Sequence, residues 1–375
     1  MRALGNVFRL GIKELYSLRR DVVMLSLIAF TFTVSVYSAA TGISHDLNNS
    51  AIAFVDEDRS QLSLRLREAF LPPYFREPEL IAYRDIDPGM DTGAYTFVLV
   101  IPSGFEADVL AGRRPAVQVN IDATAMMQAG TGERYIANIL ARETAAFVGA
   151  QGGAAATPVE LKARYAFNPN IASSWFTGIM EIINNITMLS IILTGAALIR
   201  EREHGTIEHL LVMPLTPIEI MLAKVWANGL VILIAGGLSL WLVMEILLQV
   251  PVAGSKALFL AGTALYLFFA TALGIFLATL ARSMPQFGLL FMLVVLPMNL
   301  LSGGETPIES QPEILQAIMQ AVPSTHFVSF AQAILYRDAG LDIVWPQFAL
   351  VAAIGGAFFL FAAARFRRIV SVSMA

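Results

Sequence analysis

Six long apolar runs constrain this chain more than any other feature. They lie near residues 22–43, 176–199, 225–249, 257–281, 286–302 and 347–364. A helix of roughly 20 apolar residues crosses a hydrocarbon core about 30 Å thick. With a mean hydropathy of +0.65 and only 14% charged residues, the composition also lies outside the range of soluble domains. We therefore expect an α-helical polytopic membrane protein with six transmembrane helices.

Basic residues cluster at four places, before the first run and after the second, fourth and sixth. Lys and Arg concentrate on the cytoplasmic side of membrane proteins, so both termini are expected in the cytoplasm. The clusters consist of Arg2, Arg9, Lys13, Arg19, Arg20, Arg200, Arg202, Arg282, Arg365, Arg367 and Arg368.

The segment before the first run has its own pattern. Residues 1–20 place apolar side chains at helical spacing between basic ones, which predicts an amphipathic helix in the cytoplasmic interface. Residues 21–44 then form the first transmembrane helix. The small residues SAA at 38–40 are also typical of a signal-peptide cleavage site. Because the polar leader and the apolar run are both long, we expect an uncleaved anchor.

Residues 45–172 are polar enough for a soluble domain, and the orientation places them outside the cytoplasm. Strand-like and helix-like runs alternate along them, with strands at 50–56, 79–83, 95–102 and 116–122 and helices at 59–70, 103–112 and 126–148. This alternation predicts an extracytoplasmic α/β domain with a mostly parallel sheet between the first and second spans.

The remaining residues, 173–375, are expected to form a five-helix transmembrane region. It contains a cytoplasmic elbow at 200–224 and an external loop at 303–346. In that loop EILQAIMQAV predicts a re-entrant or interfacial helix, which Pro323 ends.

The elbow, EREHGTIEHLLVMPLTPIEIMLAK at 201–224, carries signals for two helices. Gly205 and Thr206 begin the first, Glu208 favours its amino end, and Pro214 ends it. The second begins at TPIE, with a threonine cap, a proline at the first helical position and a glutamate that completes a capping box. Two helices joined by a tight hinge make a stiff projection, which suits the docking of another protein.

The elbow also resembles a known family. GTIEHLLVMPLTPIEIMLAK, preceded by EREH, is similar to the cytoplasmic elbow of the ABC-2 type transporter permeases, the membrane-spanning subunits of bacterial drug-exporter-like ABC transporters. There the pattern E-x-G-T-x-E-x-L-x-x-x-P forms the coupling helix, which receives the stroke of a nucleotide-binding subunit. More loosely, VDEDRS and DVLAGRRPAVQVNIDAT resemble the outside domain of the drug-exporter branch, and residues 301–328 its last external loop.

The resemblance implies a set of coupling residues. Each of them also has a local explanation as a cap, a stop or an interface charge, and the family pattern favours docking. They are Glu201, Glu203, Gly205, Thr206, Glu208, Pro214 and Lys224.

The sequence lacks the motifs of an ATPase. It has no G-x-x-x-x-G-K-[ST] phosphate loop, so ATP hydrolysis is expected on a separate chain, which binds the ATP and Mg, and no cofactor is expected in this one. No cysteine and no H-E-x-x-H pair are present, and we expect no metal site. The carboxylates of Asp56, Glu57 and Asp58 are read as a helix cap rather than a cation site.

Polar residues inside the spans are candidates for a translocation path, because burying them in lipid is costly. Glu181, Asn184 and Asn185 share one helix face. Glu245 lies near the end of the third span, and Asn299 follows Pro297 in the fifth. Two alternatives stay open for the first group: it lines the path or the contact between two protomers, or Glu181 merely reaches the outer interface.

Together these features predict the permease subunit of an ATP-driven exporter in the bacterial inner membrane. The expected partners are a nucleotide-binding ATPase subunit, a second permease copy or paralogue, membrane lipids and a periplasmic adaptor protein, with no nucleic acid. The family implies export of drugs, lipids or other amphiphiles. Two other classes remain: a proton-coupled secondary carrier using Glu181 and Glu245, and a membrane-anchored sensor with an extracytoplasmic ligand-binding domain.

Overall fold

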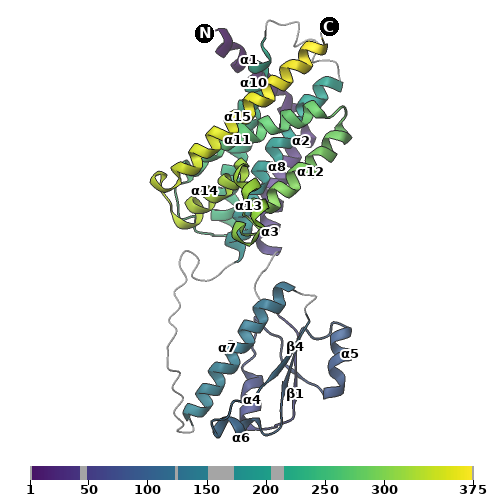
Figure 1. Cartoon of the computed structure of the whole chain (residues 1–375), viewed down its shortest axis with the longest axis vertical. Helices are drawn as coiled ribbons and strands as arrows, with labels where there is room; N and C mark the ends of the chain where they lie inside the picture. The colour runs from purple at the N-terminus through teal and green to yellow at the C-terminus, as the bar shows by residue number, and fades with distance from the viewer. Residues whose placement is uncertain (1, 43–48, 123–125, 151–172, 204–214, 374–375) are drawn as a thin grey trace. The chain divides into compact units, whose positions relative to one another are not determined.

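The computed structural model describes residues 2–42, 49–122, 126–150, 173–203 and 215–373 (Figure 1). The chain divides into two compact units. Residues Ile43–Tyr165 form one, and Met1–Gly42 together with Ala166–Ala375 form the other. Each unit has its own hydrophobic core.

The smaller unit is built on a four-stranded sheet in the order β2-β1-β3-β4. The central strands β1 (Ile52–Asp56) and β3 (Phe97–Ile101) run parallel, as do β1 and the short edge strand β2 (Glu79–Leu80). At the other edge, β4 (Gln118–Ile121) pairs antiparallel with β3. The expected α/β domain with a mostly parallel sheet is confirmed.

Helices cover both faces of this sheet. The side chains of β1 alternate between the two faces, and each face has its own apolar core. Ile52 and Phe54 pack in the core that includes residues of α4 (Gln61–Glu68), α6 (Phe105–Leu110) and α7 (Met126–Ala150). Ala53 and Val55 pack on the other face with Ile86 of α5 (Ile86–Asp91), which follows a 3-10 turn, η2 (Tyr83–Asp85). The sequence pattern predicted no helix between the strands at 79–83 and 95–102, although the proline of α5 is compatible with the first turn of a helix.

The VDEDRS segment connects β1 to α4 through local hydrogen bonds. Asp56 Oδ1 accepts the backbone N–H groups of Asp58 and Arg59 at 3.1 and 2.8 Å. Ser60 caps α4, and Asp58 Oδ2 accepts the Glu106 N–H at 3.0 Å. Asp58 therefore caps α6, and Asp56 holds the turn that precedes α4.

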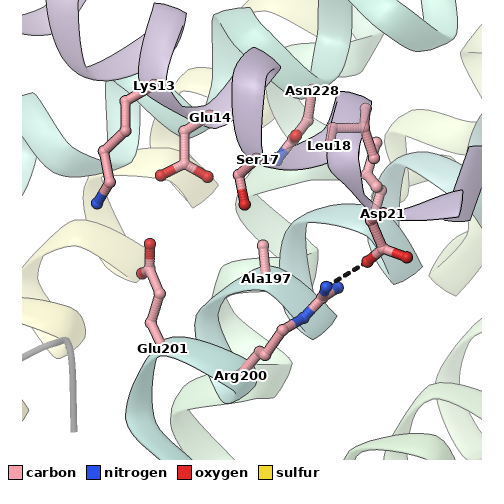
Figure 2. Close-up of a pocket in the computed structure, with 10 residues that line it drawn as sticks. Lys13, Glu14, Ser17, Leu18, Asp21, Ala197, Arg200, Glu201 and Asn228 are labelled. Carbon is pink, nitrogen blue, oxygen red and sulfur yellow. Dashed lines mark hydrogen bonds and ion pairs between the residues drawn. The ribbon is translucent and has the colours of Figure 1, made fainter. Parts of the chain in front are cut away.

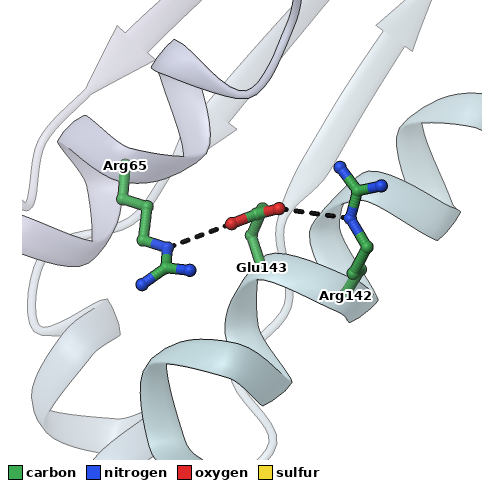
Figure 3. A network of polar contacts seen from close by, with 3 residues as sticks. All are labelled: Arg65, Arg142 and Glu143. Carbon is green, nitrogen blue, oxygen red and sulfur yellow. Dashed lines mark hydrogen bonds and ion pairs between the residues drawn. The ribbon is translucent and has the colours of Figure 1, made fainter. Parts of the chain in front are cut away.

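One ion-pair network joins the helices of this unit (Figure 3). Glu143 of α7 accepts hydrogen bonds from Arg65 of α4 at 3.0 Å and from Arg142 at 3.2 Å. These bonds, that of Arg65 first, lower the pKa of Glu143 below its ordinary value. The pairing therefore stabilises the fold above the carboxyl group's unfolded pKa, and this stabilisation is lost as the pH falls through the folded pKa.

Among its described residues, the larger unit contains six helical segments long and apolar enough to cross a membrane: Val22–Gly42, Ser174–Glu203, Pro217–Leu247, Lys256–Leu280, Met284–Leu301 and Leu341–Arg368. They are formed in turn by α2 (Val22–Phe30), η1 (Thr31–Ser35) and α3 (Val36–Gly42), by α8 (Ser173–Glu203), by α10 (Pro217–Ser239) with η3 (Leu240–Leu247), by α11 (Lys256–Leu280), by α12 (Met284–Leu301) and by α15 (Leu341–Ser373). The predicted helical polytopic fold with six spans is confirmed.

Two of the six spans form the centre of the bundle. In α8 and α11, 78% and 67% of the residues in the apolar stretch are buried, against 17–33% in the other four. A Cβ on Gly274 of α11 would lie 2.5 Å from the carbonyl oxygen of Ile191 in α8, so these helices touch backbone to backbone. Small residues of this kind are what lets membrane helices pack closely.

The region 303–346 contains more helix than the sequence interpretation expected. A 3-10 turn, η4 (Ile308–Ser310), and the expected helix, α13 (Glu313–Gln320), are present. A second helix, α14 (Pro323–Arg337), begins at the proline that was read as a stop. Pro323 does both, because proline cannot extend α13 yet fits the first turn of α14.

A matched pair of leucines in α4 tests the core of the smaller unit. Leu66 is fully buried, whereas Leu64, two residues away, is 45% exposed. We expect Leu66→Ala to destabilise this unit by about 2–5 kcal/mol, because a buried leucine leaves a cavity. We expect Leu64→Ala to cost less than about 0.5 kcal/mol. Hydrogen exchange of β1 and β3 in the intact protein measures both, and equal protection in the two variants would contradict this packing.

Candidate functional site

The candidate site lies where the amino-terminal helix, α1 (Arg2–Arg20), packs against α10. Trp226 of α10 donates its indole N–H to the Val7 carbonyl at 3.1 Å and stacks on Phe8 with ring centroids 5.6 Å apart. Gly11 makes room for the indole, since a Cβ at this position would lie 2.2 Å from the ring. The sequence of α1 therefore fits one particular place on α10.

The amino end of α10 joins the same contact. Thr216 and Glu219 form the predicted capping box, in which Thr216 accepts the Glu219 N–H and Glu219 accepts the Thr216 N–H. The other carboxylate oxygen of Glu219 accepts a hydrogen bond from Asn6 of α1 at 3.2 Å. The cap that starts α10 thus also binds α1.

Lys224 is the most unusual residue of this region, because its side chain is only 1% exposed. Its Nζ lies 3.1 Å from Glu14 Oε1 of α1 and 2.8 Å from Glu201 Oε1 of α8. Figure 2 shows the carboxylates of Glu14 and Glu201 pointing toward one another from these two helices. Helix α1, whose Glu14 is 210 residues from Lys224, therefore meets α8 and α10 at one buried ammonium group.

The energetics of this triad are asymmetric. Burying the charges costs several kcal/mol for each ion, which their mutual attraction largely offsets. Removing one partner leaves a buried charge without compensation and costs about 3–5 kcal/mol. The triad therefore adds little net stability, but it strongly penalises any movement that separates α1, α8 and α10.

The carboxyl end of α8 is attached to three further elements. Arg200 pairs with Asp21, which also caps α2 by accepting the Met24 N–H (Figure 2). Arg202 donates to the Ala281 carbonyl at the end of α11 at 2.7 Å. Glu203 accepts the Met284 N–H at the start of α12 at 3.1 Å. The end of α8 therefore contacts the first, fourth and fifth spans directly.

Asp21 is held in its charged form by this arrangement. Burial raises the pKa of Asp21, but the hydrogen bond from the Met24 N–H and the guanidinium of Arg200 outweigh it and place that pKa below its ordinary value. A charged Asp21 suits both its cap and its ion pair.

A cavity of about 370 Å³ opens beside the triad between α1 and α8 (Figure 2). Acidic, basic and apolar side chains line this cavity. The lining residues are Lys13, Glu14, Ser17, Leu18, Asp21, Leu193, Ala197, Arg200, Glu201 and Asn228.

The structure describes three of the seven predicted coupling residues. Glu201 and Lys224 meet in the triad, and Glu203 lies at the start of α12. The other four, Gly205, Thr206, Glu208 and Pro214, lie outside the described residues. The sequence interpretation did not select Glu14, although a carboxylate on the apolar side of an amphipathic helix was a signal for it.

The sequence of this chain matches a known family over most of its length. The model of the ABC-2 family of transporter proteins matches residues 22–364. The chain belongs to the ABC-2 transporter family. This confirms the resemblance seen in the elbow, and it makes the chain a permease, the non-catalytic membrane component of an ABC transporter.

Two relatives match almost the whole ABC-2 permease. The inner membrane transport permease YhhJ of Escherichia coli (strain K12) is 57% identical over 368 residues, which cover 98% of each chain. The probable multidrug ABC transporter permease YbhR of the same strain is 28% identical and covers 95% of this chain and 96% of its own. YbhS, which bears the same description, is 26% identical over 81% of each chain.

The predicted path residues of the permease fall in three separate places. Glu181 and Asn185 of α8 face the first span, where Glu181 accepts from Ser35 and Asn185 donates to the Thr31 carbonyl. Asn184, beside them, is partly exposed. A path through this group stays a prediction.

The other two candidate path residues, Glu245 and Asn299, lie on other helices than Glu181. Glu245 of η3 pairs with Lys256 at the start of α11, with 2.5 Å between Oε2 and Nζ. Asn299 is partly exposed near the end of α12, and its carbonyl accepts from Ser302. In the part of the chain that the structure describes, no hydrogen bond or ion pair joins either residue to Glu181.

The triad of the permease can be tested by removing its cation. We expect Lys224→Met to lower the free energy of unfolding by about 3–5 kcal/mol, because two buried carboxylates then face each other unpaired. Adding Glu14→Gln and Glu201→Gln to Lys224→Met should restore most of this loss. Thermal unfolding of the permease in mild detergent, followed by tryptophan fluorescence, measures the effect.

The control for this test is Lys256→Met. The Lys256 side chain is 44% exposed in its pair with Glu245, and such a pair is worth about 0–1 kcal/mol. If Lys224→Met were as stable as Lys256→Met, the triad would not hold the three helices together.

Proposed function

We propose that this permease is the membrane-spanning half of an ATP-driven exporter. Two copies, or this chain and a paralogue, surround a translocation path, and each elbow engages a separate nucleotide-binding subunit, which binds the ATP and Mg. Membership of the ABC-2 family supports an ATPase partner and a dimer. A permease of this family supplies the path, and its partner supplies the hydrolysis.

The triad is the observation that carries the coupling part of this proposal. The elbow at 200–224 runs from the end of α8 into the start of α10. Its last residue, Lys224, binds Glu201 near its beginning. The same ammonium binds Glu14 of α1. A push on the elbow therefore moves α1, α8 and α10 as one body, which is how a cytoplasmic rotation reaches the second and third spans.

The residues that contact the ATPase are proposed from the family pattern. They are Glu203, Gly205, Thr206, Glu208 and Pro214, while Glu201 and Lys224 transmit the motion behind them. We propose that residues 1–20 and the elbow lie in the cytoplasm and that residues 45–172 and 303–346 lie outside it. The basic clusters that flank the spans support this orientation.

The relatives support a location and a general class of substrate. YhhJ is described as an inner membrane transport permease, which supports the bacterial inner membrane for this chain. YbhR is described as a probable multidrug ABC transporter permease, and its lower identity supports only a general class of substrate. We propose drugs, lipids or other amphiphiles, with the extracytoplasmic domain contacting a periplasmic adaptor or gating the path.

A charge reversal in the elbow tests the coupling. We expect Glu208→Lys to reduce the ATPase activity that co-purifies with a tagged permease by about 10-fold or more, because reversing an interface charge adds like-charge repulsion. Thermal stability in detergent should not change. The matched control is Glu309→Lys, an exposed glutamate of the 303–346 region, which should leave the bound ATPase activity intact.

Two results would overturn the proposal. A well-folded permease without any bound ATPase activity would favour a secondary carrier. Equal activity in the Glu208→Lys and Glu309→Lys variants would exclude Glu208 from the docking surface.

A further inference from the structure

The carboxylate of Glu181 lies inside a membrane-spanning helix and is held in one position. Ser35 Oγ of the first span donates to Glu181 Oε1 at 2.7 Å, and Asn185 Nδ2 donates to the same oxygen at 3.2 Å. Both bonds come from neutral groups. In the residues that the structure describes, no Lys, Arg or His pairs with Glu181, in contrast to Glu201 and Glu245.

Its depth makes this charge costly. Glu181 lies about 10 Å along α8 from the first residue of its span, Ser174, at 1.5 Å per residue. Ser35 lies about as far from Gly42 at the end of the first span, so both helices place the carboxylate at a similar depth. An ionisable residue inside a membrane span is a candidate functional group by default.

The hydrogen bonds decide between the two alternatives for Glu181. A side chain that merely reached the interface would extend toward the end of α8. Instead it is fixed against Ser35 by a bond to the first span. Asn185, only 5% exposed, reinforces this position by donating both to Glu181 and to the Thr31 carbonyl at 3.1 Å.

The first span is distorted at the same point. Residues Thr31–Ser35 form a π-helix, η1, within an otherwise α-helical span. Single π-helical turns are rare and occur frequently at functional sites. Here the π-helical segment supplies both the carbonyl that holds Asn185 and the hydroxyl that holds Glu181.

The site remains accessible from the surface of the unit. Ser35, Glu181 and Asn184 are all partly exposed. Both described hydrogen bonds end on Oε1, so among the described residues Oε2 accepts none. A fixed carboxylate with one open oxygen, between two helices that are apolar enough to cross a membrane, is complementary to a cation that carries apolar groups.

We propose that Glu181 binds the cationic group of a lipophilic cation, positioned by Ser35 and Asn185. This inference rests on the proposed function, and it names lipophilic cations, such as quaternary ammonium or phosphonium compounds, as the substrate class. The ligand supplies the positive charge that the described part of the chain does not place beside Glu181. An anion of the same size and shape is rejected by the same carboxylate.

Two ions of matched shape and opposite charge test the proposal. Tetraphenylphosphonium and tetraphenylborate differ in charge but hardly in size, so the comparison isolates the carboxylate. Binding of each radiolabelled ion to the purified full-length permease in detergent is measured for the wild type and for Glu181→Gln. Glutamine keeps an oxygen acceptor for Ser35 and removes the charge.

We expect Glu181→Gln to weaken tetraphenylphosphonium binding on the order of 10-fold, the effect of about 1.4 kcal/mol, and to leave tetraphenylborate binding unchanged or stronger. Glu181→Asp should restore part of the preference for the cation. Glu309→Gln, which removes an exposed carboxylate elsewhere, should change neither ion. Equal binding of tetraphenylphosphonium by the wild type and Glu181→Gln, or none by the wild type, would overturn the proposal.

A second measurement separates this inference from the proposed function. Proteoliposomes with the permease and its ATPase partner are assayed for ATP-dependent transport of tetraphenylphosphonium. Transport that is the same in the wild type and Glu181→Gln would overturn the role of Glu181 and leave the exporter intact. Binding that depends on Glu181 without ATP-dependent transport would support the site and contradict the exporter.

Discussion

The packing of α1, α8 and α10 in this permease depends on one buried ammonium group. Lys224 is 1% exposed, so its charge needs carboxylates in place of water. Glu14 and Glu201 supply them from two other helices. The indole of Trp226, seated over Gly11, fixes the same packing through shape. Charge and shape together leave α1 a single register against α10, and they bring the end of α8 to the same point.

This constraint relates the triad to the site at Glu181. Helix α8 carries Glu201 near its carboxyl end and Glu181 about 30 Å away along its axis, at 1.5 Å per residue. It is also the most deeply buried span, closely packed on α11 through Gly195 and Gly274. A rigid, central helix is suited to move a substrate-binding carboxylate when its carboxyl end is displaced. The proposed coupling and the proposed cation site are thus two ends of one element.

Much of this arrangement could be predicted from the sequence, because it follows from local patterns. The six apolar runs, the alternation of strands and helices in residues 45–172 and the TPIE cap each depend on neighbours in the chain. The pairing of Lys224 with Glu14 could not be predicted, because the two residues are 210 positions apart and the local signal at Glu14 does not say which cation it binds. Helix α14 was missed since Pro323 ends one helix and begins the next. The π-helix of the first span has no signature in its apolar sequence.

In the proposed mechanism, α1, α8 and α10 move as one body when the ATPase partner binds nucleotide. The chain has no cysteine, so spin labels can be placed at will. Tyr16 of α1 and Ile218 of α10 are exposed and can each carry a label through Tyr16→Cys and Ile218→Cys. Their distance within one copy is measured by electron–electron double resonance, and Ile218→Cys alone reports the distance between two copies. On ATP binding, the account predicts a change between copies with the Tyr16–Ile218 distance constant. A Tyr16–Ile218 distance that changes as much as the distance between copies would contradict it.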